Sequence, residues 1–410
     1  MVGTQALVSD FVSKLRRRKI EGSQATARLT AELLRVLISQ HKQLPANGAA
    51  ALTEFVRSVG EQLIAANPIE LAVGNIVRRV LHIIQEEDFS LLKDSVGGLK
   101  FSAEAAVEDI SEGKNNQNSL AASVVSRCLQ PPLLRAVHDC SPDSPAACQI
   151  SASRDGFQGK GKSADRSAKI LKSDVIKAVN ELIEDIDTCH EQIAEQAVEL
   201  IHHNEVVLTL GRSSFVMEFL CAAKEKKRSF HVFIAEGAPR FEGHVLAQEL
   251  AKKGLKTTVI TDSAVFAIIC RVNMIVVGVH AVMANGSIIA PVGMNMIALA
   301  AKKHAVPFVV VAGTHELCPL YSQNPEVLLN EMRSPFEVLD FKEFSDAMDY
   351  GIGSGSPLLH VVDPAFDYVP PELLSLFVTD IGGYSPSYIN RLIADYYSSD
   401  NLTLQQKPAS

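Results

Sequence analysis

Between residues 206 and 313, short apolar runs alternate with longer amphipathic segments. The apolar runs have the length of a strand and are dominated by Val, Ile and Leu, which is typical of parallel strands buried on both faces. Strands that alternate with helices predict a parallel sheet with helices on both faces, the doubly wound α/β arrangement. Strands are expected at 206–210, 231–236, 256–261, 274–279 and 308–312, with shorter ones near Val338 and at 359–362, and helices at 214–226, 243–253, 263–270 and 295–304.

The first hundred residues instead place apolar side chains at helical spacing, which predicts three amphipathic helices around 29–37, 52–63 and 76–84. Residues 109–168 are rich in Ser, Asn, Gly and Lys, a composition that predicts a disordered linker. Helical spacing then returns in a segment whose other face is acidic. The expected organisation is a helical domain at 1–108, the linker at 109–168, a bridging helix at 169–202, a Rossmann-like sheet domain at 203–400 and a tail at 401–410.

Composition narrows the class of protein. The formal net charge of -8 argues against a nucleic-acid partner, because such proteins normally present a basic face to phosphates. No apolar run approaches the ~20 residues of a membrane-spanning helix, and no secretory signal follows the basic run 14–19, so we expect a cytosolic protein with no membrane partner. The cysteines form no Cys-x-x-Cys pair, and the spacing of Cys128, His138, Cys140 and Cys148 fits no common zinc pattern, so no metal is expected.

Some segments have two interpretations. The basic run 14–19 and the pair Arg78-Arg79 are interpreted as solvated helix faces, with an acidic protein partner as the alternative. Between Tyr384 and Tyr397, apolar and aromatic side chains recur at helical spacing. That stripe belongs either to the core or to an interface.

A ligand of an open parallel sheet binds beyond the carboxyl ends of its strands. No Gly-x-Gly-x-x-Gly motif follows the first expected strand, no Walker phosphate loop is present, and the glycine-rich run 351–355 opens no strand-turn-helix unit. A bound nucleotide cofactor is therefore not expected. The residues at the carboxyl edge are expected to be 211–214, 236–239, 261–263, His280, 285–287 and 313–315.

The run Val277-Gly278-Val279-His280-Ala281-Val282-Met283-Ala284-Asn285-Gly286 resembles a strand-and-turn motif of a known family. That family contains methylthioribose-1-phosphate isomerase, ribose-1,5-bisphosphate isomerase and the alpha, beta and delta subunits of eukaryotic translation initiation factor 2B. The resemblance extends over nearly the whole chain except the linker. Within the family, the segments 75–81 and 366–373 resemble the beta-type subunits in particular.

Departures from the isomerase pattern predict that the chain is not an enzyme. In the isomerases a cysteine after the first strand and an aspartate in a Gly-Ala-Asp step move the proton, and the matching positions here are Gly211 and His280. The phosphate-binding arginine ahead of a proline is replaced by Ala238, and a later Asn-Lys pair is replaced by Ala290-Pro291.

Two of these places have alternative interpretations. His280 is interpreted as a strand-end histidine that is hydrogen-bonded to a neighbouring loop, with catalysis as the alternative. Arg212, Ser213 and Ser214 are interpreted as a helix cap, with an anion site as the alternative.

The resemblance also implies partners. It implies a regulatory subunit of the guanine-nucleotide exchange factor for initiation factor 2, assembled with alpha, delta, gamma and epsilon subunits. In that role the chain helps to bind the alpha subunit of initiation factor 2 and to sense its phosphorylation. It further implies an interface pocket at Asn204 and His231, with His202 beside them. Two alternatives remain: an active sugar-phosphate isomerase and a homodimeric protein that binds a metabolite.

Overall fold

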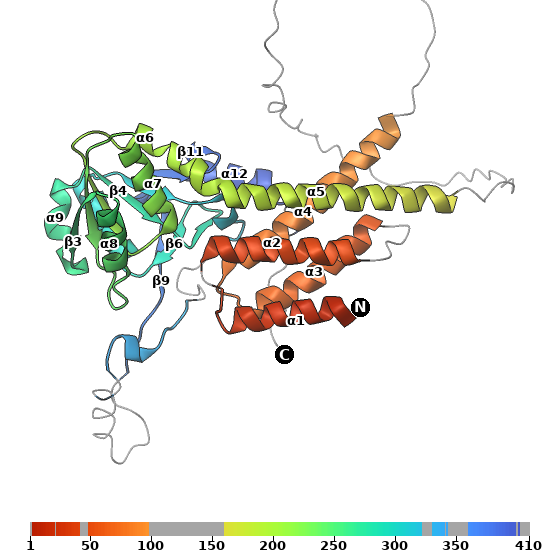
Figure 1. Cartoon of the computed structure of the whole chain (residues 1–410), viewed down its shortest axis with the longest axis horizontal. Coiled ribbons are helices and arrows are strands. Elements are labelled where there is room, and N and C mark those ends of the chain that lie inside the picture. The colour runs from red at the N-terminus through yellow and green to blue at the C-terminus, as the bar shows by residue number, and fades with distance from the viewer. Residues whose placement is uncertain are drawn as a thin grey trace, which may run out of the picture.

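The computed structural model describes residues 2–20, 22–41, 48–97, 160–321, 330–340, 342, 360–398 and 401. These residues form a half made of long helices and a half built on sheets, which lie end to end (Figure 1). No helix within the described ranges is long and apolar enough to cross a membrane.

The helical half contains one helix more than the sequence pattern predicted. Its N-terminal helix, α1, places Val8, Phe11 and Leu15 in the core shared with the other helices. These residues recur at helical spacing, so the helical pattern begins before the first predicted helix at 29–37. The helices of this half are α1 (Val2–Arg16), α2 (Ser23–Gln40), α3 (Gly48–Ala66), α4 (Leu71–Gly97) and α5 (Lys160–Glu195).

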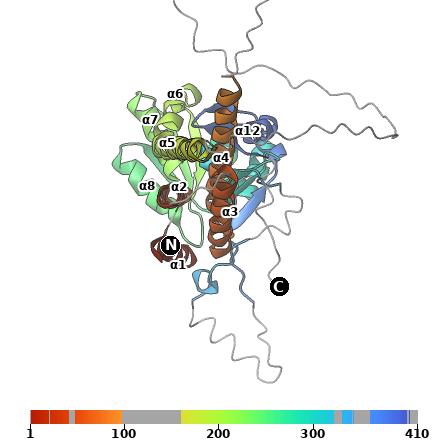
Figure 2. The ribbon, with the colours of Figure 1, turned by 90° about the vertical axis from the view of Figure 1, so that its right-hand side faces the viewer.

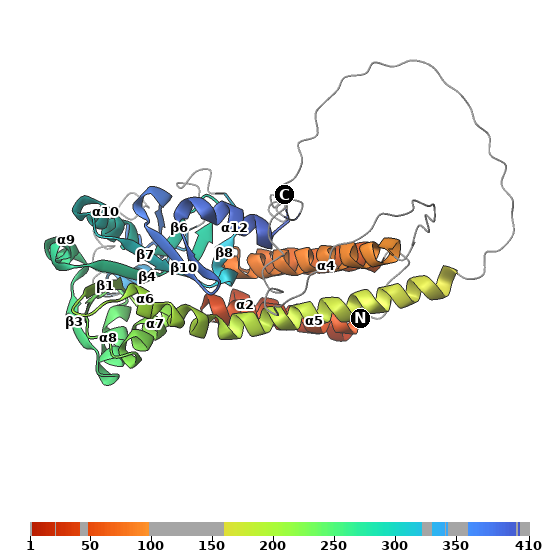
Figure 3. The ribbon, with the colours of Figure 1, turned by 90° about the horizontal axis from the view of Figure 1, so that it is seen from above.

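Helix α5 runs along the helical half and reaches the sheet half (Figure 3). It begins at Lys160 and not at the expected residue 169, so the end of the predicted linker is helical; residues 109–159 lie outside the described part of the chain. The helix also stops before 202. A turn at Gln196, whose Nε2 donates to the Thr379 carbonyl at 2.6 Å, separates it from the short α6 (Ala197–Leu200).

The main sheet has seven strands in the order β11-β10-β7-β4-β1-β2-β3, and all neighbouring pairs are parallel except β10 and β11. The five strands expected between 206 and 312 are present. Two further predicted strands are not, because Val338 and Val362 are exposed and lie outside any strand, while Leu359 lies outside the described residues. The strands are β1 (Val206–Leu210), β2 (His231–Ala235), β3 (Lys256–Ile260), β4 (Met274–Gly278), β7 (Phe308–Val311), β10 (Leu376–Thr379) and β11 (Gly382–Tyr384).

A second sheet of four short strands, in the order β8-β5-β6-β9, was not expected. Residues 285–287 form the turn of its β5–β6 hairpin, in which Ser287 donates to the Asn285 Oδ1 from both its backbone N–H and its hydroxyl. The prediction that residues 285–287 follow the end of a main-sheet strand is therefore wrong. The strands are β5 (Ala281–Met283), β6 (Ile288–Pro291), β8 (Leu317–Cys318) and β9 (Phe366–Val369).

Helices cover both faces of the main sheet, and a separate apolar core lies on each face. The helix expected at 263–270 is only one turn of α-helix, flanked by 3₁₀ turns. The stripe between 384 and 397 starts in β11 and continues in α12, where Ile389, Leu392 and Ile393 are buried, so it belongs to the core. The helices are α7 (Ser214–Glu225), α8 (Glu242–Lys252), α9 (Val265–Ile268), α10 (Met294–His304) and α12 (Ile389–Tyr396), and the 3₁₀ turns are η1 (Asp262–Ala264), η2 (Ile269–Arg271), η3 (Thr314–Glu316), η5 (Pro335–Glu337), η7 (Pro371–Leu373) and η8 (Pro386–Tyr388).

The two halves meet where α2 and α4 reach η3; Figure 2 shows α4 in front of the sheet half. Asn75 on α4 donates to the His315 carbonyl at 3.1 Å, and the Ser23 hydroxyl at the start of α2 donates to Glu316 at 2.5 Å. Arg78, expected on a solvated face, is only 2% exposed. It lies on the side of α4 that faces the sheet half, where burial lowers its pKa.

The predicted tail at 401–410 begins with a residue that is tied to the helical half. Asn401 is fully buried, accepts a hydrogen bond from Arg57 and donates one to Gln85. Residues 402–410 lie outside the described part of the chain.

Candidate functional site

The carboxyl edge of the main sheet is the place where an isomerase of this fold would act. Gly211 directly follows β1 with a φ of 64°, and its N–H donates to the Ala235 carbonyl at 3.3 Å. Glycine adopts this left-handed conformation without the steric cost that a side chain adds. The position therefore supports a tight turn and supplies no acid or base.

At the next loop of this edge, an internal carboxylate occupies the backbone amides. Gly237 and Ala238 donate their N–H groups to the two carboxylate oxygens of Asp262, at 3.0 Å and 2.8 Å. Paired backbone amides of this kind are a common way to bind an anion. Here Asp262 already takes that place, and Ala238 offers no cationic side chain for a substrate phosphate.

Two more amide sites at the same edge are occupied in the same way. Asp367 on β9 accepts hydrogen bonds from the Gly293 and Asn295 N–H groups at the start of α10, at 2.8 Å and 3.1 Å. Asp380 accepts from the Thr314 N–H at 2.8 Å and from its hydroxyl at 2.9 Å. Helix N-termini attract anions. The chain's own aspartates therefore accept the hydrogen bonds that these donors could otherwise give to a phosphate group.

His280 lies at the end of β4 and faces the helical half. Its backbone N–H donates to the Ile289 carbonyl, its Nε2 lies 3.1 Å from the Ile69 carbonyl, and its ring stacks on Phe366 with centroids 4.5 Å apart. A carbonyl accepts only, so Nε2 carries the proton in this contact. The geometry is that of a strand-end histidine bonded to a neighbouring loop.

Arg212 has an internal partner as well. Its guanidinium donates to both carboxylate oxygens of Glu249 on α8, at 3.1 Å and 3.0 Å, and this contact raises the pKa of Arg212. Ser213 occupies the N-cap position of α7 without a capping hydrogen bond from its side chain. A bidentate pair with a carboxylate leaves Arg212 poorly placed to bind an anion.

The three predicted interface residues lie at the opposite edge of the sheet, where β1 and β2 begin. The Asn204 N–H donates to the Ser229 carbonyl at 2.6 Å and the His231 N–H to the Glu205 carbonyl at 2.9 Å, so the two loops are adjacent. His231 Nε2 lies 2.9 Å from the Thr258 hydroxyl, and partial burial lowers its pKa. The exposed His202 donates its N–H to Glu205 at 2.8 Å.

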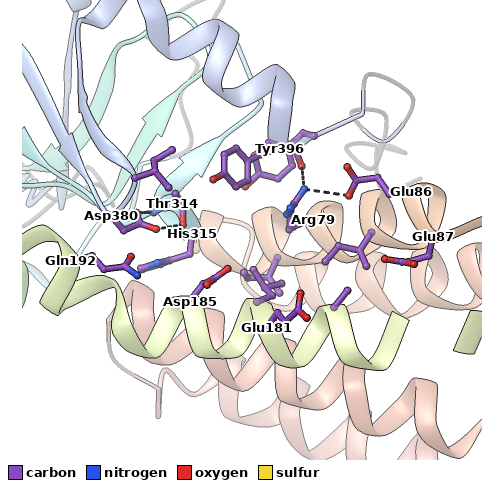
Figure 4. A pocket seen from close by; sticks show the side chains of 16 residues that line it. Arg79, Glu86, Glu87, Glu181, Asp185, Gln192, Thr314, His315, Asp380 and Tyr396 are labelled. Carbon is purple, nitrogen blue, oxygen red and sulfur yellow. Dashed lines mark hydrogen bonds and ion pairs between the residues drawn. The ribbon is translucent and has the colours of Figure 1, made fainter. Parts of the chain in front are cut away.

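A cavity that the sequence did not predict lies between the two halves. It is lined by Arg79 and by acidic residues of α4 and α5, together with residues of η3 and α12 (Figure 4). Its members come from segments far apart in the chain, so no local motif marks them.

The fold and its edges define a class: a Rossmann-like protein with a helical half, whose amide sites at the carboxyl edge are occupied by its own carboxylates. Residues 19–386 match the model of the Initiation factor 2 subunit family. The chain belongs to that family.

Relatives across nearly the full length share this membership. The chain is 37% identical over 408 residues to the translation initiation factor eIF2B subunit beta of Dictyostelium discoideum, covering 96% of this chain and 95% of that protein. It is 32% identical over 410 residues to the subunit beta of Schizosaccharomyces pombe, with 98% of each chain covered. The ribose 1,5-bisphosphate isomerase of Archaeoglobus fulgidus is 32% identical over 220 residues, which cover 54% of this chain and 66% of that protein.

Solved structures confirm the predicted fold. The crystal structure of eIF2B beta from Chaetomium thermophilum has a TM-score of 0.66 at 22% identity, over 98% of this chain and 96% of that chain. A chain of the tetrameric eIF2B-beta2-delta2 complex from the same organism has a TM-score of 0.61 at 22% identity, over 96% and 95%. The family model and the full-length relatives confirm the predicted family resemblance, and the names of these relatives support a beta subunit of initiation factor 2B.

Proposed function

We propose that this chain is a non-catalytic regulatory subunit of the guanine-nucleotide exchange factor for translation initiation factor 2. In this role it helps to bind the alpha subunit of initiation factor 2 and to sense its phosphorylation. The support is the near full-length similarity to proteins named eIF2B subunit beta.

The occupied amide sites are the observation that carries the non-catalytic part of the proposal. Asp262, Asp367 and Asp380 each accept two hydrogen bonds from groups at the carboxyl edge. A phosphate would have to displace them and would meet their negative charge. With glycine at 211 and a histidine turned toward Ile69 at 280, an acid-base pair for isomerisation is also missing from these matched positions.

A turnover assay tests this part. The purified chain is incubated with ribose 1,5-bisphosphate, and ketose formation is followed by NMR, with a ribose 1,5-bisphosphate isomerase as the positive control. We expect no product above the buffer blank. Clear turnover would establish the alternative of an active isomerase.

The partners that we propose are the alpha, delta, gamma and epsilon subunits of initiation factor 2B and initiation factor 2 itself. One structurally similar chain comes from a complex described as eIF2B-beta2-delta2. Exposed apolar side chains support a partner on the sheet half: Phe266 on α9 is 57% exposed, and Met296 and Leu299 on the adjacent α10 are 45% and 55% exposed. Such side chains on neighbouring helices are typical of protein interfaces.

The edge with Asn204, His231 and His202 is proposed as a second part of that interface. His231 is partly buried within the free chain and has a hydroxyl partner, so its ring is held in a defined position. A charge introduced there would be desolvated against a partner and left unpaired.

Replacement of His231 by Asp tests the interface. We expect His231→Asp to weaken association with a delta subunit by about tenfold or more, measured by co-purification and light scattering. His244→Asp is the matched control, because His244 is exposed on α8, away from the start of β2, and should leave association unchanged.

Native mass of the chain isolated from its own cells tests the whole proposal. A large hetero-oligomer is expected. A lone homodimer would instead support the alternative of a self-sufficient protein that binds a metabolite.

A further inference from the structure

A cavity of about 430 Å³ lies at the junction between the helical half and the sheet half. Helices α4 and α5 form its long walls, while η3 and α12 close the end nearest the sheet (Figure 4). The volume is within the range of small-molecule sites. We call it the acidic pocket.

The charges that line the acidic pocket are strongly unbalanced. Its carboxylates are Glu86 and Glu87 on α4, Glu181 and Asp185 on α5, and Asp380 beyond β10, and Arg79 is the cation among the lining residues. Glu87, Glu181 and Asp185 form no ion pair or hydrogen bond through their side chains with any described residue. Burial and neighbouring carboxylates raise the pKa of Glu87 and of Asp185. Lys177 and Arg79 act in the opposite direction on Glu87 and Asp185, respectively, but burial and the neighbouring carboxylates outweigh them.

Arg79 is already engaged and does not neutralise the whole cluster. Its guanidinium donates to the Tyr396 carbonyl at 3.1 Å, lies 3.9 Å from Glu86 and sits 4.9 Å from the centre of the Tyr396 ring. Glu181 and Asp185 are one helical turn apart on α5. Their carboxylates form a row along the pocket, because residues four apart lie on the same side of a helix.

A buried histidine provides independent evidence for a ligand. His315 on η3 lines the pocket and is 3% exposed, yet neither of its ring nitrogens has a hydrogen-bond partner among the described residues. Burial lowers its pKa to about 3, so the ring is neutral at physiological pH and one nitrogen is an acceptor. Buried polar atoms are almost always hydrogen-bonded. A hydrogen-bond donor of a ligand in the pocket would give the His315 ring the partner that it lacks.

The residues that line the acidic pocket favour an organic cation over a metal ion. No three described Asp, Glu, His or Cys side chains converge closely enough to hold a metal ion. Between the carboxylates the wall contains Ile76, Ile83 and Leu182, and Tyr396 adds an aromatic face. Carboxylates separated by apolar side chains suit a ligand in which ammonium groups are separated by methylene groups.

We propose that the acidic pocket binds a linear aliphatic polyamine. Its ammonium groups pair with Glu181, Asp185 and the α4 carboxylates, its terminal N–H groups donate toward His315, and its methylene groups pack on the Ile and Leu side chains. Because the walls come from both halves, the ligand fastens the helical half to the sheet half. This inference does not rest on the proposed function, although Thr314 and Asp380 belong both to the carboxyl edge and to the wall of the pocket.

Calorimetric titration of the full-length chain with spermidine tests the proposal, in buffers matched for ionic strength. The paired variant Glu181→Gln with Asp185→Asn removes two pocket charges from α5. We expect saturable binding of one spermidine per chain and a loss of affinity of about tenfold or more in this variant. The control variant, Glu191→Gln with Glu195→Gln, removes the same charge from exposed positions of α5 outside the pocket lining and should bind spermidine as the unmodified chain does.

Two further measurements separate a built site from general attraction between opposite charges. Magnesium chloride at the same ionic strength should not compete with spermidine. Imidazole ¹⁵N signals of His315 should shift on addition of spermidine, and thermal unfolding without ligand should show that the variants are folded. The proposal is overturned if the pocket and control variants bind equally, if magnesium competes equally well, or if the His315 signals do not move.

Discussion

Glu316 shows how one residue links stability to pH. Its side chain is 2% exposed and accepts hydrogen bonds from the Ser23 hydroxyl and the Gly313 N–H, yet burial raises its pKa from 4.5 to about 8. The two donors favour the carboxylate, but the loss of hydration outweighs them. The folded chain therefore holds a proton on Glu316 at a pH where the unfolded chain has lost it.

Replacement of Glu316 by Gln should remove this effect. A raised carboxyl pKa makes the free energy of unfolding fall as pH rises from about 4.5 to 8, by about 1.4 kcal/mol for each pH unit. We expect Glu316→Gln to flatten that slope, measured by denaturant unfolding at several pH values between 5 and 8. The exposed control Glu191→Gln should keep it, and an unchanged slope in Glu316→Gln would contradict the interpretation.

At the scale of elements, close approach of α3 and α4 sets the shape of the helical half. A Cβ atom added at Gly60 on α3 would lie too close to Cγ1 of Val77 on α4. Both positions are buried in the core of the helical half. Glycine therefore serves here to let two helices pack closely, although it weakens a helix.

Gly60→Ala should destabilise the protein despite the better helix propensity of alanine. The added methyl group must push α3 and α4 apart, and overpacking of this kind costs about 1–3 kcal/mol. Thermal or chemical denaturation measures the effect. Ser58→Ala, at an exposed position of the same helix, is the control and should be neutral or slightly stabilising.

At the scale of the whole molecule, α5 joins the two halves because its buried face belongs to two cores. Leu171, Val175 and Val179 pack in the helical half, whereas Cys189 and Ile193 pack against α7 and the sheet. The helix is continuous between these regions. The two halves should consequently unfold together.

A break in α5 at Thr188 should let the helical half and the sheet half unfold separately. A proline there removes a helical hydrogen bond and clashes with the preceding turn, which costs about 3 kcal/mol or more. We expect the calorimetric unfolding of Thr188→Pro to divide into two transitions, while Thr188→Ala keeps one, because the Thr188 side chain is exposed and bonds only to its own helix. A single transition in Thr188→Pro would show that α2 and α4 alone couple the halves.

Local pattern alone determined the strands between 206 and 312 and the helices expected at 214–226, 243–253 and 295–304. Each of these properties is written within a few consecutive residues, because burial on both faces of a strand or one face of a helix imposes a periodicity. The family resemblance added the expected partners and the expectation that Gly211 and His280 replace an acid-base pair. The strands expected near Val338 and at 359–362 were wrong, since a short apolar stretch has no periodicity to separate a strand from a loop.

Contacts between segments far apart in the chain could be read only from the tertiary structure. It brought Asp262, Asp367 and Asp380 onto the amides of the carboxyl edge, added β8 and β9 to the two sides of the β5–β6 hairpin as a second sheet, and buried Arg78. It also gathered acidic residues of α4, α5 and the chain beyond β10 around His315. The sequence around a carboxylate or an arginine does not indicate its partner, because that partner depends on which segments pack against it in the folded chain.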